Sequence, residues 1–159
     1  MAKNGFSMSN RIAVETVTAD KTLTKDDCGK VFIVQTATNA AQVDITLPGH
    51  VSAGEGWNVE LIIESGSKHA PNQALVITGS GDAADLNASP FAVNVISQAA
   101  LANDGGYSAP TVGSCGKITH AAATQNDGDF IKIVNASGSK DGWRWYTSGV
   151  TSGSLTLGH

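Results

Sequence analysis

Residues 42–47 read Gln42-Val43-Asp44-Ile45-Thr46-Leu47, and this stretch decides the expected fold. Its apolar residues Val43, Ile45 and Leu47 alternate with polar ones, as in a β-strand with one buried face and one face in water. Pro48 follows directly. Because proline has no N–H for a ladder hydrogen bond, we expect the strand to end at Leu47. A half-buried strand closed by a turn indicates a layered β-structure.

Runs of similar length recur along the chain, each bounded by Gly, Pro, Asn or Asp. The expected strands are Arg11 to Val17, Lys30 to Thr36, Gln42 to Leu47, Trp57 to Glu64, Gln73 to Thr78, Phe91 to Ser97, Lys117 to Ala122, Phe130 to Asn135, Trp143 to Ser148 and Ser154 to Leu157. Many short strands with turn signals between them are typical of a sandwich. We therefore predict an all-β fold, an antiparallel β-sandwich of jelly-roll type with about nine or ten strands and little helix.

Length and composition favour one folded domain. The chain has 159 residues, of which 18 are glycine, and 15% are charged. A chain of this size buries enough surface to fold without a metal or a disulfide. The first ten residues are polar and patternless, so we predict a flexible arm at residues 1–10 and a single β-sandwich domain at residues 11–159. A stretch from Ser97 to Asn103 is the one short helical candidate.

The charge pattern argues against nucleic acid and membranes as partners. The net charge is −4, and the ten Lys and Arg are scattered singly rather than clustered as phosphate binding requires. No run approaches the roughly 18 apolar residues of a membrane span, and no secretory signal is recognisable. Cys28 and Cys115 do not form a CxxC pair. In a reducing cytosol we expect two free, half-buried thiols, with a disulfide as the alternative.

No catalytic or metal-binding motif stands out. The four histidines have no ligand spacing, and His120, on an alternating strand, is the one expected to be packed. Carboxylates at Asp26-Asp27, Asp82 with Asp85, and Asp127 with Asp129 suit β-turns, with a Ca²⁺ site as the weaker alternative. No nucleophile lies in a GxSxG frame, and no flanked pair of acids suits glycoside hydrolysis. We predict no enzyme activity, no cofactor and no metal.

The most distinctive string is Trp143-Arg144-Trp145-Tyr146. On a strand, Trp143 and Trp145 share one face. They can be core anchors of a sandwich rich in small residues. The alternative is a stacking platform for a sugar or an interface hot spot, where Trp, Tyr and Arg are enriched. We also expect Trp57 to join the core.

The order of several segments resembles a module of tailed-phage structural proteins. These segments are Thr22 to Val34 with its Asp27-Cys28-Gly29-Lys30 turn, Asp44 to Pro48, Ala53 to Val59, Leu75 to Thr78, Gly128 to Ile133 and Trp143 to Tyr146. The resemblance covers roughly residues 14 to 150. Cys28 departs from the module, where a small polar residue or Ala is more usual. The resemblance implies capsid decoration proteins or parts of tail and head fibres, generally homotrimers.

We therefore expect a capsid decoration or cement protein, assembled in the host cytoplasm and located on the virion surface. Its expected partners are further copies in a homotrimer and the phage major capsid protein. The alternative is a tail or head fibre tip that binds a host carbohydrate. Partner contacts are expected from the arm and from an irregular loop, Asn103 to Gly116, in which Gly105, Gly106, Pro110 and Gly113 oppose regular structure. The candidate partner-binding residues are Met1, Ala2, Lys3, Asn4, Gly5, Phe6, Tyr107, Trp143 and Trp145.

Overall fold

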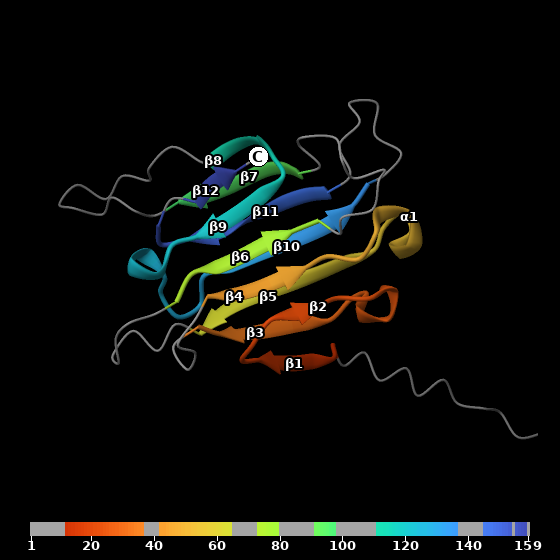
Figure 1. Cartoon of the computed structure of the whole chain (residues 1–159), viewed down its shortest axis with the longest axis horizontal. Helices are drawn as coiled ribbons and strands as arrows, with labels where there is room; N and C mark the ends of the chain where they lie inside the picture. Colours follow the sequence, from red (N-terminus) through yellow and green to blue (C-terminus); the bar gives the residue numbers. More distant parts are fainter. Residues whose placement is uncertain are drawn as a thin grey trace, which may run out of the picture.

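The computed structural model describes residues 12–36, 42–64, 73–79, 91–97, 111–136, 145–153 and 155–158, with backbone only for 92–97, 111–114 and 123. Two sheets lie one over the other with their strands in nearly the same direction (Figure 1). The seven-stranded sheet has the order β1 (Val14–Val17), β3 (Val31–Gln35), β5 (Asn58–Glu64), β10 (Phe130–Asn135), β11 (Trp145–Thr151), β7 (Phe91–Ser97) and β8 (Thr111–Cys115). The five-stranded sheet has the order β12 (Leu155–Gly158), β9 (Lys117–His120), β6 (Leu75–Thr78), β4 (Val43–Thr46) and β2 (Lys21–Thr22).

The helical content among the described residues is three short turns. They are α1 (His50–Ala53) and the two 3₁₀ turns η1 (Lys25–Asp27) and η2 (Ala122–Thr124). In Figure 1, α1 and η2 lie at opposite ends of the sandwich. The prediction of an all-β sandwich with little helix is thus confirmed. The arm at residues 1–10 lies outside the described residues.

The sheets are mixed, which corrects the expectation of antiparallel pairing. From β1 to β6 each strand is followed by one in the opposite sheet. Because the chain returns to a sheet only after crossing to the other, β1, β3 and β5 are parallel, as are β2, β4 and β6. Antiparallel pairs include β7–β8 and β10–β11, where the chain turns back within a sheet, and pairs of strands distant along the chain, such as β5–β10 and β6–β9. The parallel pairs distinguish this topology from an antiparallel jelly roll.

Most expected strands are present, with bounds shifted by a few residues, but three elements were not anticipated. β2 has only two residues, and α1 begins two residues after Pro48 in a stretch without a helical sequence pattern. β8 lies inside the segment predicted to be an irregular loop, so that prediction is wrong for Thr111–Cys115. Backbone pairing with β7 outweighs the local preference of Gly113.

The core fills the space between the sheets. Alternation turns one face of each strand inward, and the buried apolar residues form one cluster. Its large, nearly fully buried members include Trp57, Trp145, Phe32, Phe91, Leu61 and Ile118. Trp57 is therefore a core residue, as predicted.

Candidate functional site

The outer face of the seven-stranded sheet carries an apolar row. In β3, β5 and β10 the inward residues Phe32, Leu61 and Ile131 are fully buried, so their neighbours along each strand point outward. The outward residues are apolar as well and stand directly opposite one another from strand to strand: Ile33 beside Ile62, Ile62 beside Phe130, and Phe130 beside Val150. All four are half-buried. We call Ile33, Ile62, Phe130 and Val150 the apolar row.

Two further rows follow the apolar row in one direction along the strands, on the same face. In the first, Glu60 of β5 stands directly opposite Lys132 of β10, and we call these two the charged pair. In the second, beyond the charged pair, lie half-buried Val134 and Tyr146, and the relative exposure of Tyr146 is 38%. Val14 of the outermost strand is 59% exposed on this face. The outer face of the seven-stranded sheet therefore combines apolar side chains with the charged pair and with a second acid, the exposed Glu64 at the end of β5, which accepts a hydrogen bond from Gln35.

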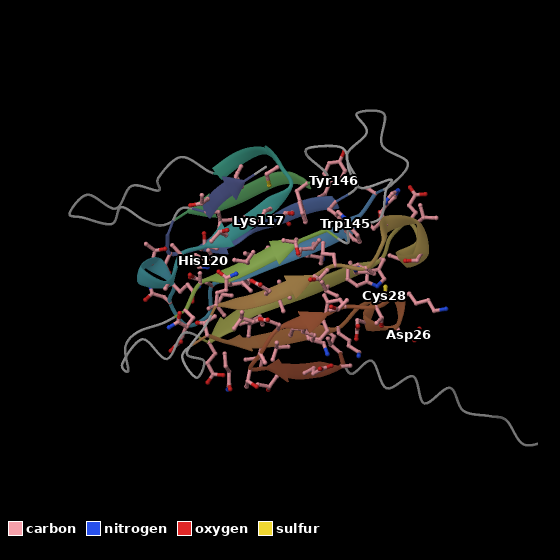
Figure 2. The ribbon with its side chains drawn as sticks, in the orientation of Figure 1. Asp26, Cys28, Lys117, His120, Trp145 and Tyr146 are labelled. Atoms are coloured by element: carbon pink, nitrogen blue, oxygen red, sulfur yellow. The ribbon has the colours of Figure 1, made fainter. Side chains whose placement is uncertain are left out.

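The outer face of the other sheet is different. Its outward positions on neighbouring strands are mostly threonine: Thr46, Thr78, Thr119 and Thr156. Lys117, on β9, is exposed there (Figure 2). Such a surface is usual for a sheet that faces water. The contrast within one molecule marks the seven-stranded sheet as the candidate interaction surface, because contiguous apolar side chains on a surface indicate a partner.

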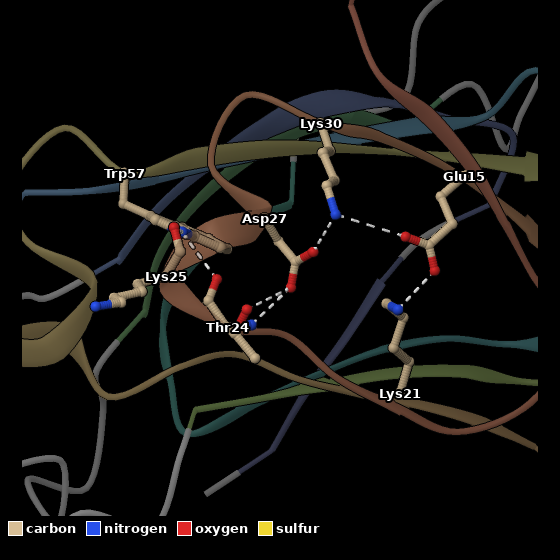
Figure 3. A network of polar contacts seen from close by, with 7 residues as sticks. All are labelled: Glu15, Lys21, Thr24, Lys25, Asp27, Lys30 and Trp57. Atoms are coloured by element: carbon tan, nitrogen blue, oxygen red, sulfur yellow. Dashed lines mark hydrogen bonds and ion pairs between the residues drawn. The ribbon is translucent and has the colours of Figure 1, made fainter.

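Charged side chains close the edge of the sandwich at β1 and β2. Glu15 and Lys21 sit at inward-facing positions, and Lys21 Nζ lies 2.6 Å from Glu15 Oε1 (Figure 3). Lys21 Nζ also lies 5.5 Å from the centroid of the Phe32 ring. Charges turned inward at an edge oppose pairing with a foreign strand. This edge is therefore protected rather than open for strand addition.

The turn at Asp26-Asp27 beside this edge is structural. Asp27 Oδ2 accepts hydrogen bonds from the Thr24 backbone N–H and hydroxyl, and Asp27 Oδ1 accepts one from Lys30 Nζ at 2.6 Å (Figure 3). Partial burial would raise the pKa of Asp27, but the hydrogen bonds from Lys30 and Thr24 outweigh it and hold the pKa below its usual value. The indole N–H of Trp57 donates to the carbonyls of Thr24 and Lys25, both at 3.2 Å. The Asp27 carboxylate thus fixes a turn, which is the role that the sequence favours for Asp26-Asp27.

A buried polar cluster holds the opposite end of the sandwich. His120 of β9 is fully buried, as expected, and its Nε2 lies 3.3 Å from Asp129 Oδ2 at the start of β10. Asp129 Oδ1 accepts hydrogen bonds from the backbone N–H and hydroxyl of Ser152, after β11. Burial lowers the pKa of His120, and the Asp129 charge and the backbone of Thr124 partly oppose this. Figure 2 places His120 at this end of the molecule.

The arrangement of that cluster does not form a catalytic relay. The Ser152 hydroxyl donates to the carboxylate and not to the imidazole, whereas an activated serine must bond to its base. Gln125 extends the cluster, since its Nε2 donates to the His120 carbonyl and its Oε1 accepts from the Thr36 hydroxyl. The cluster therefore ties both sheets and the loop after η2 together. Among the described residues, no group of three or more His, Cys, Asp or Glu is placed to hold a metal ion.

Of the predicted partner-binding residues, one is described and is buried, and the others lie outside the described residues. Trp145 is fully buried, with its ring 5.5 Å from that of Trp57 in a T-shaped arrangement at 77°. Trp145 is therefore a core anchor, and its assignment as a partner contact is wrong. Its neighbour Tyr146 points outward instead, because successive side chains alternate (Figure 2). The arm residues Met1, Ala2, Lys3, Asn4, Gly5 and Phe6, together with Tyr107 and Trp143, lie outside the described residues.

The two cysteines are free, as predicted, but neither is half-buried. Cys28 is exposed in the turn after η1, and Cys115 is buried at the end of β8. Burial raises the pKa of Cys115 to about 11. Cys115 is therefore a protonated core residue, and Cys28 is the accessible thiol.

Comparisons with known proteins give no relatives. No protein-family model matches the chain, and neither the curated proteins nor the solved structures contain a match. Within the described part of the chain, no helix has the length and apolar character to cross a membrane.

Proposed function

We propose that this chain is a structural protein of a tailed-phage virion, which decorates and stabilises the capsid by binding the major capsid protein lattice. It acts as a homotrimer on the capsid surface and performs no catalysis. The resemblance of its ordered segments to phage structural modules suggests the virion. The observation that carries the proposal is the apolar row on the outer face of the seven-stranded sheet.

The apolar row supports a role in assembly because the outer face of a sheet that meets only water is usually polar. Ile33, Ile62 and Phe130 stand side by side on three neighbouring strands and remain partly exposed in the single chain. Apolar area left in water is worth roughly 25 cal/mol per Å² when a partner covers it. Covering this face with another protein surface would therefore stabilise an assembly.

A fibre tip that binds a host carbohydrate is the second candidate. Sugar binding of that kind uses exposed aromatic rings beside polar groups. Trp143 and Tyr107, the exposed aromatic residues that this candidate requires, lie outside the described residues, and Trp145 of the same string is buried in the core. Capsid decoration is the preferred proposal because the apolar row favours a protein partner over a sugar.

Attachment to capsids tests the proposal. The purified chain is mixed with capsids from which it is absent, and the capsids are sedimented and analysed for bound protein. We expect saturable binding at many copies per capsid. Binding that fails to saturate, or none at all, would contradict a decorating role, and binding of polysaccharides from host cells instead would favour the fibre tip.

A further inference from the structure

We propose that copies of this chain contact one another through the outer face of the seven-stranded sheet, with the β3–β5 half of one copy against the β10–β11 half of the next. This inference deepens the proposed function and rests on the self-association it includes.

The apolar row crosses four neighbouring strands of the face that a second copy would cover. Strands β5 and β10 are adjacent, with β3 and β11 on either side. The row crosses these four strands over about 14 Å at the usual strand spacing. Its members are apolar on both sides of the boundary between β5 and β10: Ile33 and Ile62 on one side, Phe130 and Val150 on the other.

The charged pair makes this face complementary to itself. Glu60 and Lys132 stand directly opposite each other, one on each side of the β5–β10 boundary. A symmetry axis parallel to the strands, above this boundary, places the β5 side of one copy against the β10 side of the next. Glu60 of one copy then meets Lys132 of the next.

The same operation aligns the apolar row with itself. Ile62 of one copy meets Phe130 of the next, and both lie at the same level along the strands. The outer members, Ile33 and Val150, meet in the same way, since each lies one strand further from the axis. In these two rows apolar groups therefore face apolar groups, and opposite charges face each other. A two-fold axis lays the two faces flat against each other, whereas the three-fold axis of the proposed homotrimer inclines them and keeps the order of the contacts, with the β5 side of one copy against the β10 side of the next.

Two other surfaces of the described chain fit a second copy less well. The edge at β1 and β2 is closed by the inward ion pair of Glu15 and Lys21. The outer face of the five-stranded sheet is largely threonine. Neither offers apolar side chains that match in register.

Charge reversal provides the test. Sedimentation velocity of the full chain over a concentration series gives the association constant for the unmodified protein and for Glu60→Lys, Lys132→Glu and the double variant. We expect each single variant to weaken association at least about tenfold, because it places like charges across the contact. The double variant restores opposite charges and should return to within about threefold of the unmodified protein.

Two controls separate contacts between copies from effects within one chain. Lys117→Glu makes the same charge change at an exposed lysine of the other sheet, and we expect unchanged association. Glu60 and Lys132 are also neighbours within one chain, so folding of each variant is checked by circular dichroism and thermal unfolding. A mixture of the Glu60→Lys and Lys132→Glu proteins should associate more strongly than either alone, since only contacts between copies gain from mixing.

The outcomes are distinguishable from failure of the proposed function. Self-association that neither Glu60→Lys nor Lys132→Glu weakens beyond the Lys117→Glu control overturns this face as the contact, while self-association itself stands. An unmodified protein that remains monomeric at micromolar concentration overturns the contact altogether. Capsid attachment is measured separately by co-sedimentation, so its loss would count against the proposed function alone.

Discussion

Asn135, at the end of β10, pins the α1 turn, and its truncation should destabilise the fold measurably. Its relative exposure is 1%. Its Nδ2 donates to the carbonyls of His50 at 2.7 Å and Gly54 at 2.8 Å, the residues that begin and follow α1. In Asn135→Ala both hydrogen bonds are lost.

The size of the effect depends on the hydrogen bonds that the His50 and Gly54 carbonyls retain in Asn135→Ala. The His50 carbonyl also accepts from the Gly54 N–H at 3.2 Å, and the Gly54 carbonyl accepts from the Trp57 N–H at 3.3 Å. Neither is left without a donor, so the cost is the net value of two hydrogen bonds, about 0.5 to 1.5 kcal/mol each. We expect Asn135→Ala to lower the free energy of unfolding by about 2 kcal/mol and Tm by roughly 4 to 8 °C.

Urea unfolding followed by tryptophan fluorescence measures this change. The matched control is Asn58→Ala, because the half-buried Asn58 Nδ2 donates only to the Gly56 carbonyl at 3.1 Å in a solvent-exposed contact. We expect the control to stay within about 0.5 kcal/mol. Asn135→Asp should cost more than Asn135→Ala, since it turns a carboxylate oxygen toward carbonyl oxygens. Equal stability of the two alanine variants would refute the assigned role of Asn135.

Three further predictions concern buried groups. Burial lowers the pKa of His120, so near pH 6.5 the unfolded chain takes up a proton that the folded chain resists. The free energy of unfolding should therefore fall as pH drops below about 6.5. In His120→Gln, urea unfolding at a series of pH values should lack this His120 contribution to the pH dependence of the free energy of unfolding. Iodoacetamide at pH 8 should label Cys28 and spare Cys115 in the folded protein, and mass spectrometry showing both labelled at equal rates would contradict the burial of Cys115. Trp145→Ala should cost about 3 to 5 kcal/mol and Tyr146→Ala less than about 1 kcal/mol in chemical denaturation, and similar costs would show that the two side chains are not turned to opposite sides.

The sequence predicts the strands well because their signal is local. Val43, Ile45 and Leu47 alternate as a half-buried strand should, and all three are fully buried. Which strands pair, and in which direction, does not depend on local sequence. The parallel arrangement of β1, β3 and β5 depends on the chain crossing between sheets after each strand, and no residue pattern states this. β8 was missed for the same reason, since its pairing with β7 is a tertiary contact.

The candidate surface was only partly foreseeable. Leu61, Ile62 and Ile63 form a continuous apolar run in β5, so both faces of that strand are apolar, and such a run is the sequence signal for a second contact. Which of its residues face outward follows from register with β3 and β10 alone. The prediction for Trp145 as a partner contact was wrong because an aromatic residue suits a core and an interface equally well. The burial of Trp145 in the structure decides for the core.

We propose that this chain is a many-copy structural part of a phage particle. Quantitative mass spectrometry of purified particles, produced by the genome that carries its gene, measures its copy number against the major capsid protein. We expect copies in the hundreds per particle, removable without loss of the tail. A handful of copies would point to a fibre or tail position, and absence of the chain from purified particles would contradict a structural role in the virion.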